Sequence, residues 1–173
     1  NRTVYTSEFL HVKIVDEINI SNTKNRPFSA IQIYYDRKFW ENLVTVRVLG
    51  KYGNDTARPI DYYIHYASED YIGVTVHFYV YLDRYVSVLK NTFRVFLIFE
   101  QINTIEVKSL NDKIGLYLNM TPCPFLPYPV KNLRVEFKAP EDTTVEIDDV
   151  VPVSGRSKKE NDIFYKFSEI QFE

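Results

Sequence analysis

The residues of this chain that could do chemistry are three histidines, one cysteine and a pair of adjacent aspartates. His11, His65 and His77 each lie in a run of alternating residues, on the side opposite the main apolar row. None has another His, Cys or carboxylate at a metal-ligand spacing such as His-x-x-x-His. We therefore expect surface or cross-strand positions for the histidines rather than roles as ligands or bases.

The cysteine and the aspartates also lack the neighbours that chemistry would need. Cys123 lies between two prolines with no histidine near it, so we expect a packed or exposed thiol rather than a nucleophile. The acids around Asp148 and Asp149 lack the regular spacing of a calcium loop and indicate a turn. Gly-rich phosphate loops and Gly-x-Ser-x-Gly are absent. The sequence thus predicts a chain that is not an enzyme and has no cofactor or metal; a buried cluster of titrating side chains would contradict this.

The composition indicates that the chain, including these candidate residues, is built mainly of β-strands. Of the 173 residues, 16% are aromatic, including 14 Tyr and 12 Phe, which favours β-sheet. The net charge of −2 gives no electrostatic case for a nucleic-acid partner. No apolar run reaches about 18 residues, so no transmembrane helix is expected. We expect a single soluble domain over residues 1–173. Because Asn1 is not a native start, we expect this domain to be excised from a longer protein.

The stretch from Tyr71 to Phe99 predicts the centre of the fold. Apolar residues recur at every second position from Ile72 to Leu82, which is the strand period. The second arm, Thr92 to Glu100, is apolar on both faces, as in a strand covered on both sides. We expect the two arms to form the central strand pair. Further strands are predicted at 2–7, 9–20, 28–35, 43–49, 60–66, 104–108, 114–119, 133–137, 145–147 and 163–167.

Other segments predict turns, loops and one short helix. Asp36 is a suitable N-cap for a helical turn that ends at Asn42, and residues 50–59 predict an exposed loop. Residues 121–129 hold four prolines, all within the eight positions 122–129, which predicts an extended surface connector without ladder hydrogen bonds. Basic residues within 153–162 favour a solvated loop over a binding patch. About ten short strands with little helix predict an all-β fold, an antiparallel β-sandwich.

Two rows of tyrosines leave two interpretations open. His77, Tyr79 and Tyr81 share one face of the first central arm, and Tyr62 and Tyr66 share one face of another strand. Such rows could stack on sugar rings. Packing against a neighbouring sheet or subunit is the favoured alternative, because Tyr buries a large area while its hydroxyl stays wet.

Four sites match the N-glycosylation acceptor pattern, at Asn1, Asn19, Asn54 and Asn119. About one or two would be expected by chance from the composition. The excess favours an extracytosolic protein. Asn54 is the best acceptor because it lies in the predicted loop, whereas Asn119 is weakened by the proline that follows Thr121.

The segment from Leu126 to Phe137 carries a resemblance to a known family. It reads Leu126-Pro127-Tyr128-Pro129-Val130-Lys131 and continues into the alternating residues 133–137. This is similar to the ribophorin I family, the first, non-catalytic subunit of the oligosaccharyltransferase complex, whose Ser-Pro-Tyr-Pro-Thr-Lys segment leads into a strand. Residues 2–4, 12–22, 80–100 and 164–170 resemble other family segments in the same order. Leu126 and Val130 replace the family's Ser and Thr, and its second Pro-Tyr-Pro is absent, which allows for a distant, archaeal-type homologue.

The resemblance implies a function that no residue pattern shows by itself. It implies a β-rich ectodomain on the extracytosolic side of a membrane, in the endoplasmic reticulum lumen or on an archaeal cell exterior, with an anchor outside this chain. It implies an accessory scaffold for protein N-glycosylation, partnered by the catalytic transferase and other membrane subunits, with no catalytic residue of its own. A carbohydrate-binding or adhesin-like surface domain is the alternative. Exposed aromatics and prolines suit interfaces; we expect a partner surface at Phe39, Trp40, Pro122, Pro124, Pro127, Tyr128 and Pro129.

Overall fold

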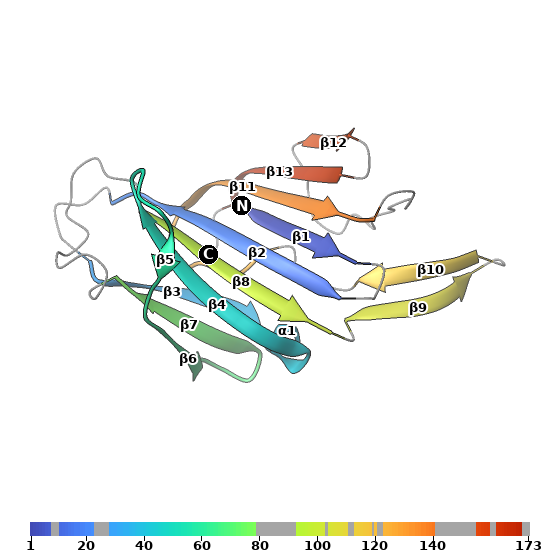
Figure 1. The fold of residues 1–173 in the computed structure, drawn as a ribbon, viewed down its shortest axis with the longest axis horizontal. Helices are drawn as coiled ribbons and strands as arrows, with labels where there is room; N and C mark the ends of the chain where they lie inside the picture. Colours follow the sequence, from blue (N-terminus) through green and yellow to red (C-terminus); the bar gives the residue numbers. More distant parts are fainter. Residues whose placement is uncertain are drawn as a thin grey trace.

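The computed structural model of this chain is built almost entirely of strands (Figure 1). It describes residues 1–7, 11–22, 28–78, 93–102, 104–110, 113–118, 120, 123–140, 155–159 and 162–170. The largest sheet has eight strands in the order β12-β13-β11-β1-β2-β8-β4-β5. Their bounds are β1 (Arg2–Thr6), β2 (Val12–Ile20), β4 (Leu43–Tyr52), β5 (Arg58–Pro59), β8 (Phe93–Gln101), β11 (Val130–Lys138), β12 (Gly155–Lys159) and β13 (Asp162–Ile170).

A three-stranded sheet faces the large one. It has the order β3-β7-β6, with β3 (Ala30–Asp36), β7 (Tyr71–His77) and β6 (Tyr62–Tyr66). A separate hairpin of β9 (Ile105–Leu110) and β10 (Lys113–Leu118) extends to one side in Figure 1. The predicted all-β sandwich is therefore confirmed. One pair departs from the antiparallel expectation, because β1 runs parallel to β11 with Arg2 opposite Val135.

The two arms that the sequence placed side by side belong to different sheets, so the predicted central pair is wrong. β8 pairs with β2 and β4, whereas β7 pairs with β3 and β6. Both strands turn their apolar rows toward the same core from opposite sides. Along β8 every second residue from Phe93 to Gln101 is buried, and the alternate row, which includes Phe96 and Ile98, is only half-buried.

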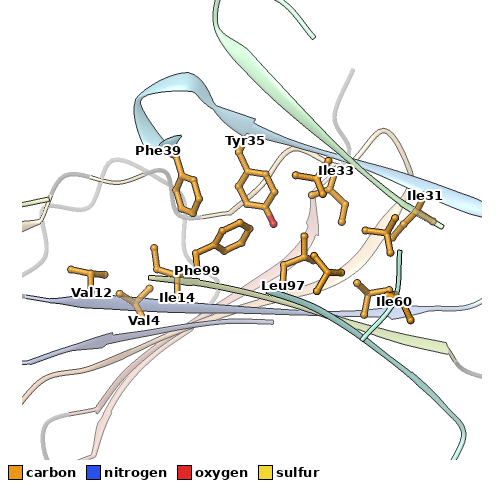
Figure 2. Close-up of a cluster of buried hydrophobic side chains, with 14 of the residues drawn as sticks. Val4, Val12, Ile14, Ile31, Ile33, Tyr35, Phe39, Ile60, Leu97 and Phe99 are labelled. Carbon is orange, nitrogen blue, oxygen red and sulfur yellow. The ribbon is translucent and has the colours of Figure 1, made fainter. Parts of the chain in front are cut away.

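Between the two sheets lies one continuous hydrophobic core (Figure 2). The smaller sheet and its helix contribute Phe39, Tyr35 and Ile33 to the core. These side chains pack toward Phe99 and Leu97 of β8 (Figure 2). The rings of Tyr35 and Phe39 stack with centroids 5.0 Å apart, and Phe99 meets both edge-on at 4.9 Å. Edge-to-face aromatic contacts of this kind add about 0.5–1.5 kcal/mol each to the area they bury.

The single helix of the described residues, α1 (Arg37–Glu41), closes one end of this core. The predicted cap is confirmed, because Asp36 Oδ1 accepts a hydrogen bond of 2.8 Å from Lys38 N–H. The buried side chain of Gln101 donates to the Phe39 carbonyl and so ties the helix to β8. The side chain of Phe39 therefore points from the helical turn into the core and not to solvent.

Two predicted loops contain strands. The segment 50–59 was expected to be an exposed loop, but β4 continues to Tyr52 and Arg58–Pro59 pairs with it as β5. The segment 153–162 contains β12, which pairs with β13 at the border of the large sheet. The predicted strand at 145–147 and the tip of the first central arm lie outside the described residues.

Candidate functional site

The most distinctive surface of the described residues is the outer face of the three-stranded sheet. Strand alternation puts Ile33 and Val74 in the core and turns their neighbours outward. The cross-strand register then aligns the outward residues in rows, because paired residues share a face. We call this the outer ring surface and define it by Tyr34, Tyr63, His65, Tyr71, His77 and the overlying Phe125.

The rings of this surface form a continuous row. Tyr63 stacks on His77 with centroids 5.5 Å apart and planes 26° apart, and it contacts His65 at 5.2 Å. Tyr34 meets His65 edge-on at 6.4 Å and Phe125 at 5.9 Å, and Tyr71 continues the row beyond Phe125 at 6.4 Å. Tyr63 remains 50% exposed and Tyr71 44% exposed. Solvent therefore reaches the row at Tyr71, which ends it, and at Tyr63, near its other end.

A glycine seats one of these rings. A Cβ on Gly73 would collide with Nε2 and Cε1 of His65, so the imidazole lies directly on the β7 backbone. His65 Nδ1 and the hydroxyl of Thr75, both of this face, are buried and have no hydrogen-bond partner among the described residues. Buried polar atoms usually have partners. The ring row therefore contains two hydrogen-bonding groups that the described part of the fold leaves unused.

The opposite outer face is of another kind. On the eight-stranded sheet, ion pairs such as Arg47–Glu100 and Arg94–Glu17, each at 3.6 Å, lie at the surface. Exposed pairs of this type contribute about 0–1 kcal/mol and mainly keep a surface soluble. Among the described side chains, the connected row of rings lies on the small-sheet side, although Tyr5 of the large sheet is also exposed. We therefore take the small-sheet side as the candidate binding surface.

The proline segment, residues 121–129, borders this surface through its described residues 123–129 and covers the β3 edge. Phe125 N–H donates to the Tyr34 carbonyl at 2.8 Å and Tyr34 N–H donates to the Phe125 carbonyl at 2.9 Å. The hydroxyl of Tyr128 accepts from Gln32 N–H at 3.2 Å. The expectation of a connector without ladder bonds is corrected at Phe125, because this residue, unlike the flanking prolines, has an N–H to donate.

The residues predicted to form an interface divide into three groups. Phe39 is buried in the core, so the expectation that it is exposed to a partner is wrong. Trp40 is half-buried and packs edge-on against Tyr35 and Phe99 at 6.0 Å. Of the proline segment, Pro124 is half-buried, Pro127, Tyr128 and Pro129 are exposed, and Pro122 lies outside the described residues.

The acceptor asparagines lie where a glycan could be attached. Asn1 and Asn19 are exposed, and Asn54 is exposed in a turn beside Gly53, whose φ of 51° suits a residue without a side chain. Asn119 lies outside the described residues. His11 is half-buried and directly precedes β2, so it lies just outside the strand that was predicted to contain it.

Sequence reasoning missed a buried ionic cluster between the sheets. Arg2 is bidentate to Asp16, with Nε–Oδ1 and Nη2–Oδ2 distances of 2.7 Å, and the Tyr35 hydroxyl donates to Asp16 Oδ2 at 2.9 Å. The guanidinium also lies 5.7 Å from the Phe39 ring centroid. All three side chains are almost fully buried. A usable signal existed: Asp16 occupies the apolar phase of β2, between Ile14 and Ile18.

The charges of this cluster stabilise one another. Burial alone would lower the pKa of Arg2, but the charge and hydrogen bonds of Asp16 outweigh it and raise that pKa. Burial raises the pKa of Tyr35 well above its ordinary value, and the negative charge of Asp16 adds to the effect. Burial also raises the pKa of the Cys123 thiol, which disfavours the thiolate that a nucleophile requires. The cluster is the kind of buried titrating set named above as evidence against the non-enzyme prediction. Its three groups bond to one another, and the absence of enzyme activity stays a prediction.

Neither metal ligation nor a membrane helix emerges from the described residues. Within them, no group of three or more His, Cys, Asp and Glu side chains could hold a metal ion. No helix of the described part of the chain has the length and apolar character needed to cross a membrane. Comparison with known proteins adds no assignment, because no protein-family model and no curated protein matches the chain.

Proposed function

We propose that this chain is a non-catalytic accessory domain of an oligosaccharyltransferase complex, similar to the luminal region of ribophorin I. The observation that carries the proposal is the outer ring surface, an exposed aromatic face whose rim is built by the segment most similar to that family. Tyrosine is enriched at protein interfaces because its ring buries a large area at low conformational cost. The domain would lie on the extracytosolic side of a membrane, in the endoplasmic reticulum lumen or outside an archaeal cell.

The position of the proline segment in the sandwich also supports this role. Phe125 and Tyr128 bond to β3 of the small sheet, and Val130 begins β11 of the large sheet. One short segment therefore links both layers at the border of the ring surface. A partner that contacts this border would touch a rigid part of the fold. The proposed partners are the catalytic transferase and other membrane subunits.

Copurification tests the proposal. The full-length protein, extracted from its native membrane in mild detergent, should bring a catalytic glycosyltransferase subunit with it. Combining Tyr63→Ala with Tyr71→Ala should reduce the recovered transferase at least tenfold while leaving the fold intact. Tyr5→Ala is the matched control, because Tyr5 is 39% exposed but lies on the large sheet. Recovery without any transferase, or equal recovery with all variants, would contradict the proposal.

A carbohydrate-binding surface is the second candidate function. It is favoured by the stacked pair of Tyr63 and His77, which presents an exposed aromatic ring beside an imidazole donor. Aromatic rings pack on the C–H faces of pyranose sugars, and polar groups beside them fix the orientation. A glycan array should then give binding that Tyr63→Ala abolishes and Tyr5→Ala preserves. Tyr79 and Tyr81, which the sequence placed in the same row, lie outside the described residues.

Glycosylation tests the proposed compartment separately. Asn54 is exposed in its turn and is expected to carry an N-linked glycan when the protein is made in its own cells. Asn54→Gln should remove one glycan from the intact mass, whereas Thr56→Ser keeps the acceptor pattern and should keep the glycan. An unmodified Asn54 in the native protein would argue against an extracytosolic location.

A further inference from the structure

The edges of the two larger sheets are protected unequally. At the β3 edge, Phe125 and Tyr128 occupy the outward backbone groups of Tyr34 and Gln32. In the large sheet, β5 is two residues long and contains Pro59, and β12 carries Arg156, Lys158 and Lys159. A covering segment, a short proline strand and a row of positive charge each prevent edge-to-edge pairing.

The fourth edge, β6, has none of these devices among the described residues. Its sequence is Tyr-Tyr-Ile-His-Tyr, with no proline, lysine, arginine or acidic residue. Ile64 is 44% exposed and Tyr66 is 63% exposed. In Figure 1, β6 lies at the lower border of the molecule. An uncharged, apolar edge strand is a template for the addition of another strand.

The hydrogen bonds define which groups face outward. His77 N–H donates to the Asp61 carbonyl at 2.8 Å, so the odd-numbered residues of this strand face β7. Antiparallel alternation then directs the N–H and C=O groups of Tyr62, Ile64 and Tyr66 away from the sheet. An added strand must bond to these three residues.

We propose that β6 pairs antiparallel with β6 of a second copy of this chain, joining two three-stranded sheets across a two-fold axis at Ile64. A second copy is the occupant that the strand itself fits, because its sequence is nearly palindromic about Ile64, with Tyr at positions 62 and 66 and aromatic rings at positions 63 and 65. Tyr62 lies opposite Tyr66 of the other copy, Ile64 lies opposite Ile64, and each pair exchanges its backbone hydrogen bonds. No other register allowed by the outward groups pairs all of β6.

The same register is favourable for the side chains. It places Tyr63 opposite His65 of the other copy, the combination of rings that already meets at 5.2 Å within one chain. Asp61 falls opposite Ala67, so no like charges meet. A two-fold axis perpendicular to the sheet keeps each face on its own side, and the two outer ring surfaces merge into one. The dimer does not depend on the proposed function.

The oligomeric state and two substitutions at Ile64 test the proposal. Sedimentation of the 173-residue chain over a concentration series should give a dimer. Ile64→Pro removes an outward N–H at an edge strand, where proline is tolerated, and should raise the dissociation constant at least tenfold. Ile64→Thr, which keeps the N–H and the β-branched shape, should stay dimeric. A monomer at every concentration, or a dimer that withstands Ile64→Pro, would overturn the proposal.

Disulfide trapping tests the register and remains informative if the proline variant fails to fold. In a Cys123→Ser background, Ile64→Cys should cross-link under mild oxidation, because hydrogen-bonded antiparallel partners have Cα atoms about 5.5 Å apart. Tyr66→Cys should not cross-link, since two copies of residue 66 would be about 13 Å apart in this register. Cross-linking of Tyr66→Cys as fast as Ile64→Cys would overturn the pairing.

Discussion

Tyr34 and Tyr35 are neighbours in the chain, yet they lie on opposite faces of one sheet in opposite environments. Tyr35 is buried, and its hydroxyl is held by the carboxylate of Asp16, whereas Tyr34 belongs to the outer ring surface and donates to Gln32 at an exposed site. The inner face uses its polar groups to stabilise the fold. The outer face carries a row of rings and two buried polar atoms that have no hydrogen-bond partner among the described residues. The comparison separates residues that stability requires from residues that binding could use.

The inner face should respond most strongly to loss of the Asp16 charge. Asp16→Ala leaves the Arg2 guanidinium buried without its counter-ion, and we expect a loss of about 3–5 kcal/mol in the free energy of unfolding. Urea unfolding followed by circular dichroism measures it. Replacing both partners, Arg2→Met with Asp16→Leu, should recover most of the loss. A stable Asp16→Ala protein would contradict the view that the cluster stabilises the core.

The two neighbouring tyrosines give the next largest difference. Tyr35→Phe removes a hydrogen bond to a buried carboxylate and should cost about 1.5–3 kcal/mol. Tyr34→Phe removes an exposed hydroxyl and should change the unfolding free energy by less than about 0.5 kcal/mol. Equal effects from the two substitutions would mean that the two faces are not distinguished as the contacts indicate.

Two glycines sharpen the same comparison. A Cβ at Gly50 would lie 2.8 Å from Ile60 Cγ2 and 2.9 Å from Phe93 Cζ, both in the core, so Gly50→Ala should destabilise by about 1–3 kcal/mol. At Gly73 the Cβ would meet only the His65 ring, which can swing toward solvent. Gly73→Ala should therefore cost less than about 1 kcal/mol and shift the NMR signals of His65. A larger loss at Gly73 than at Gly50 would reverse the assignment of the faces.

The smallest expected effect is a dependence of stability on alkaline pH. The pKa of Tyr35 is raised in the fold, so the unfolded chain loses this proton first, near pH 10. The contribution of neutral Tyr35 is complete below pH 10 and is lost as the pH rises, by up to about 1.4 kcal/mol per pH unit. Unfolding at pH 9–11 should give a shallower slope for Tyr35→Phe than for the original chain. Identical slopes would count against a raised pKa.

Alternation in the sequence predicted which residues face the core better than it predicted which strands pair. The rows of β2 and β8 and the cap at Asp36 follow from local spacing and chemistry, and the structure confirms them. The pairing of β7 with β8 was wrong because period-two spacing defines a face and not a sheet. The buried Arg2–Asp16 pair was missed because charged residues were assumed to be exposed. Phe39 was misplaced because a single helical turn has no periodicity that reveals its buried side.

The parallel pairing of β1 with β11 has a consequence for how the chain is made. Because Arg2 of β1 pairs with Val135 of β11, β1 emerges from the ribosome long before this neighbouring strand is synthesised. Contacts with such a large sequence separation form late, and until then one side of β1 is available to wrong partners. Nascent molecules of this protein should therefore need protection of the free side of β1 until residues 130–138, which form β11, have been synthesised.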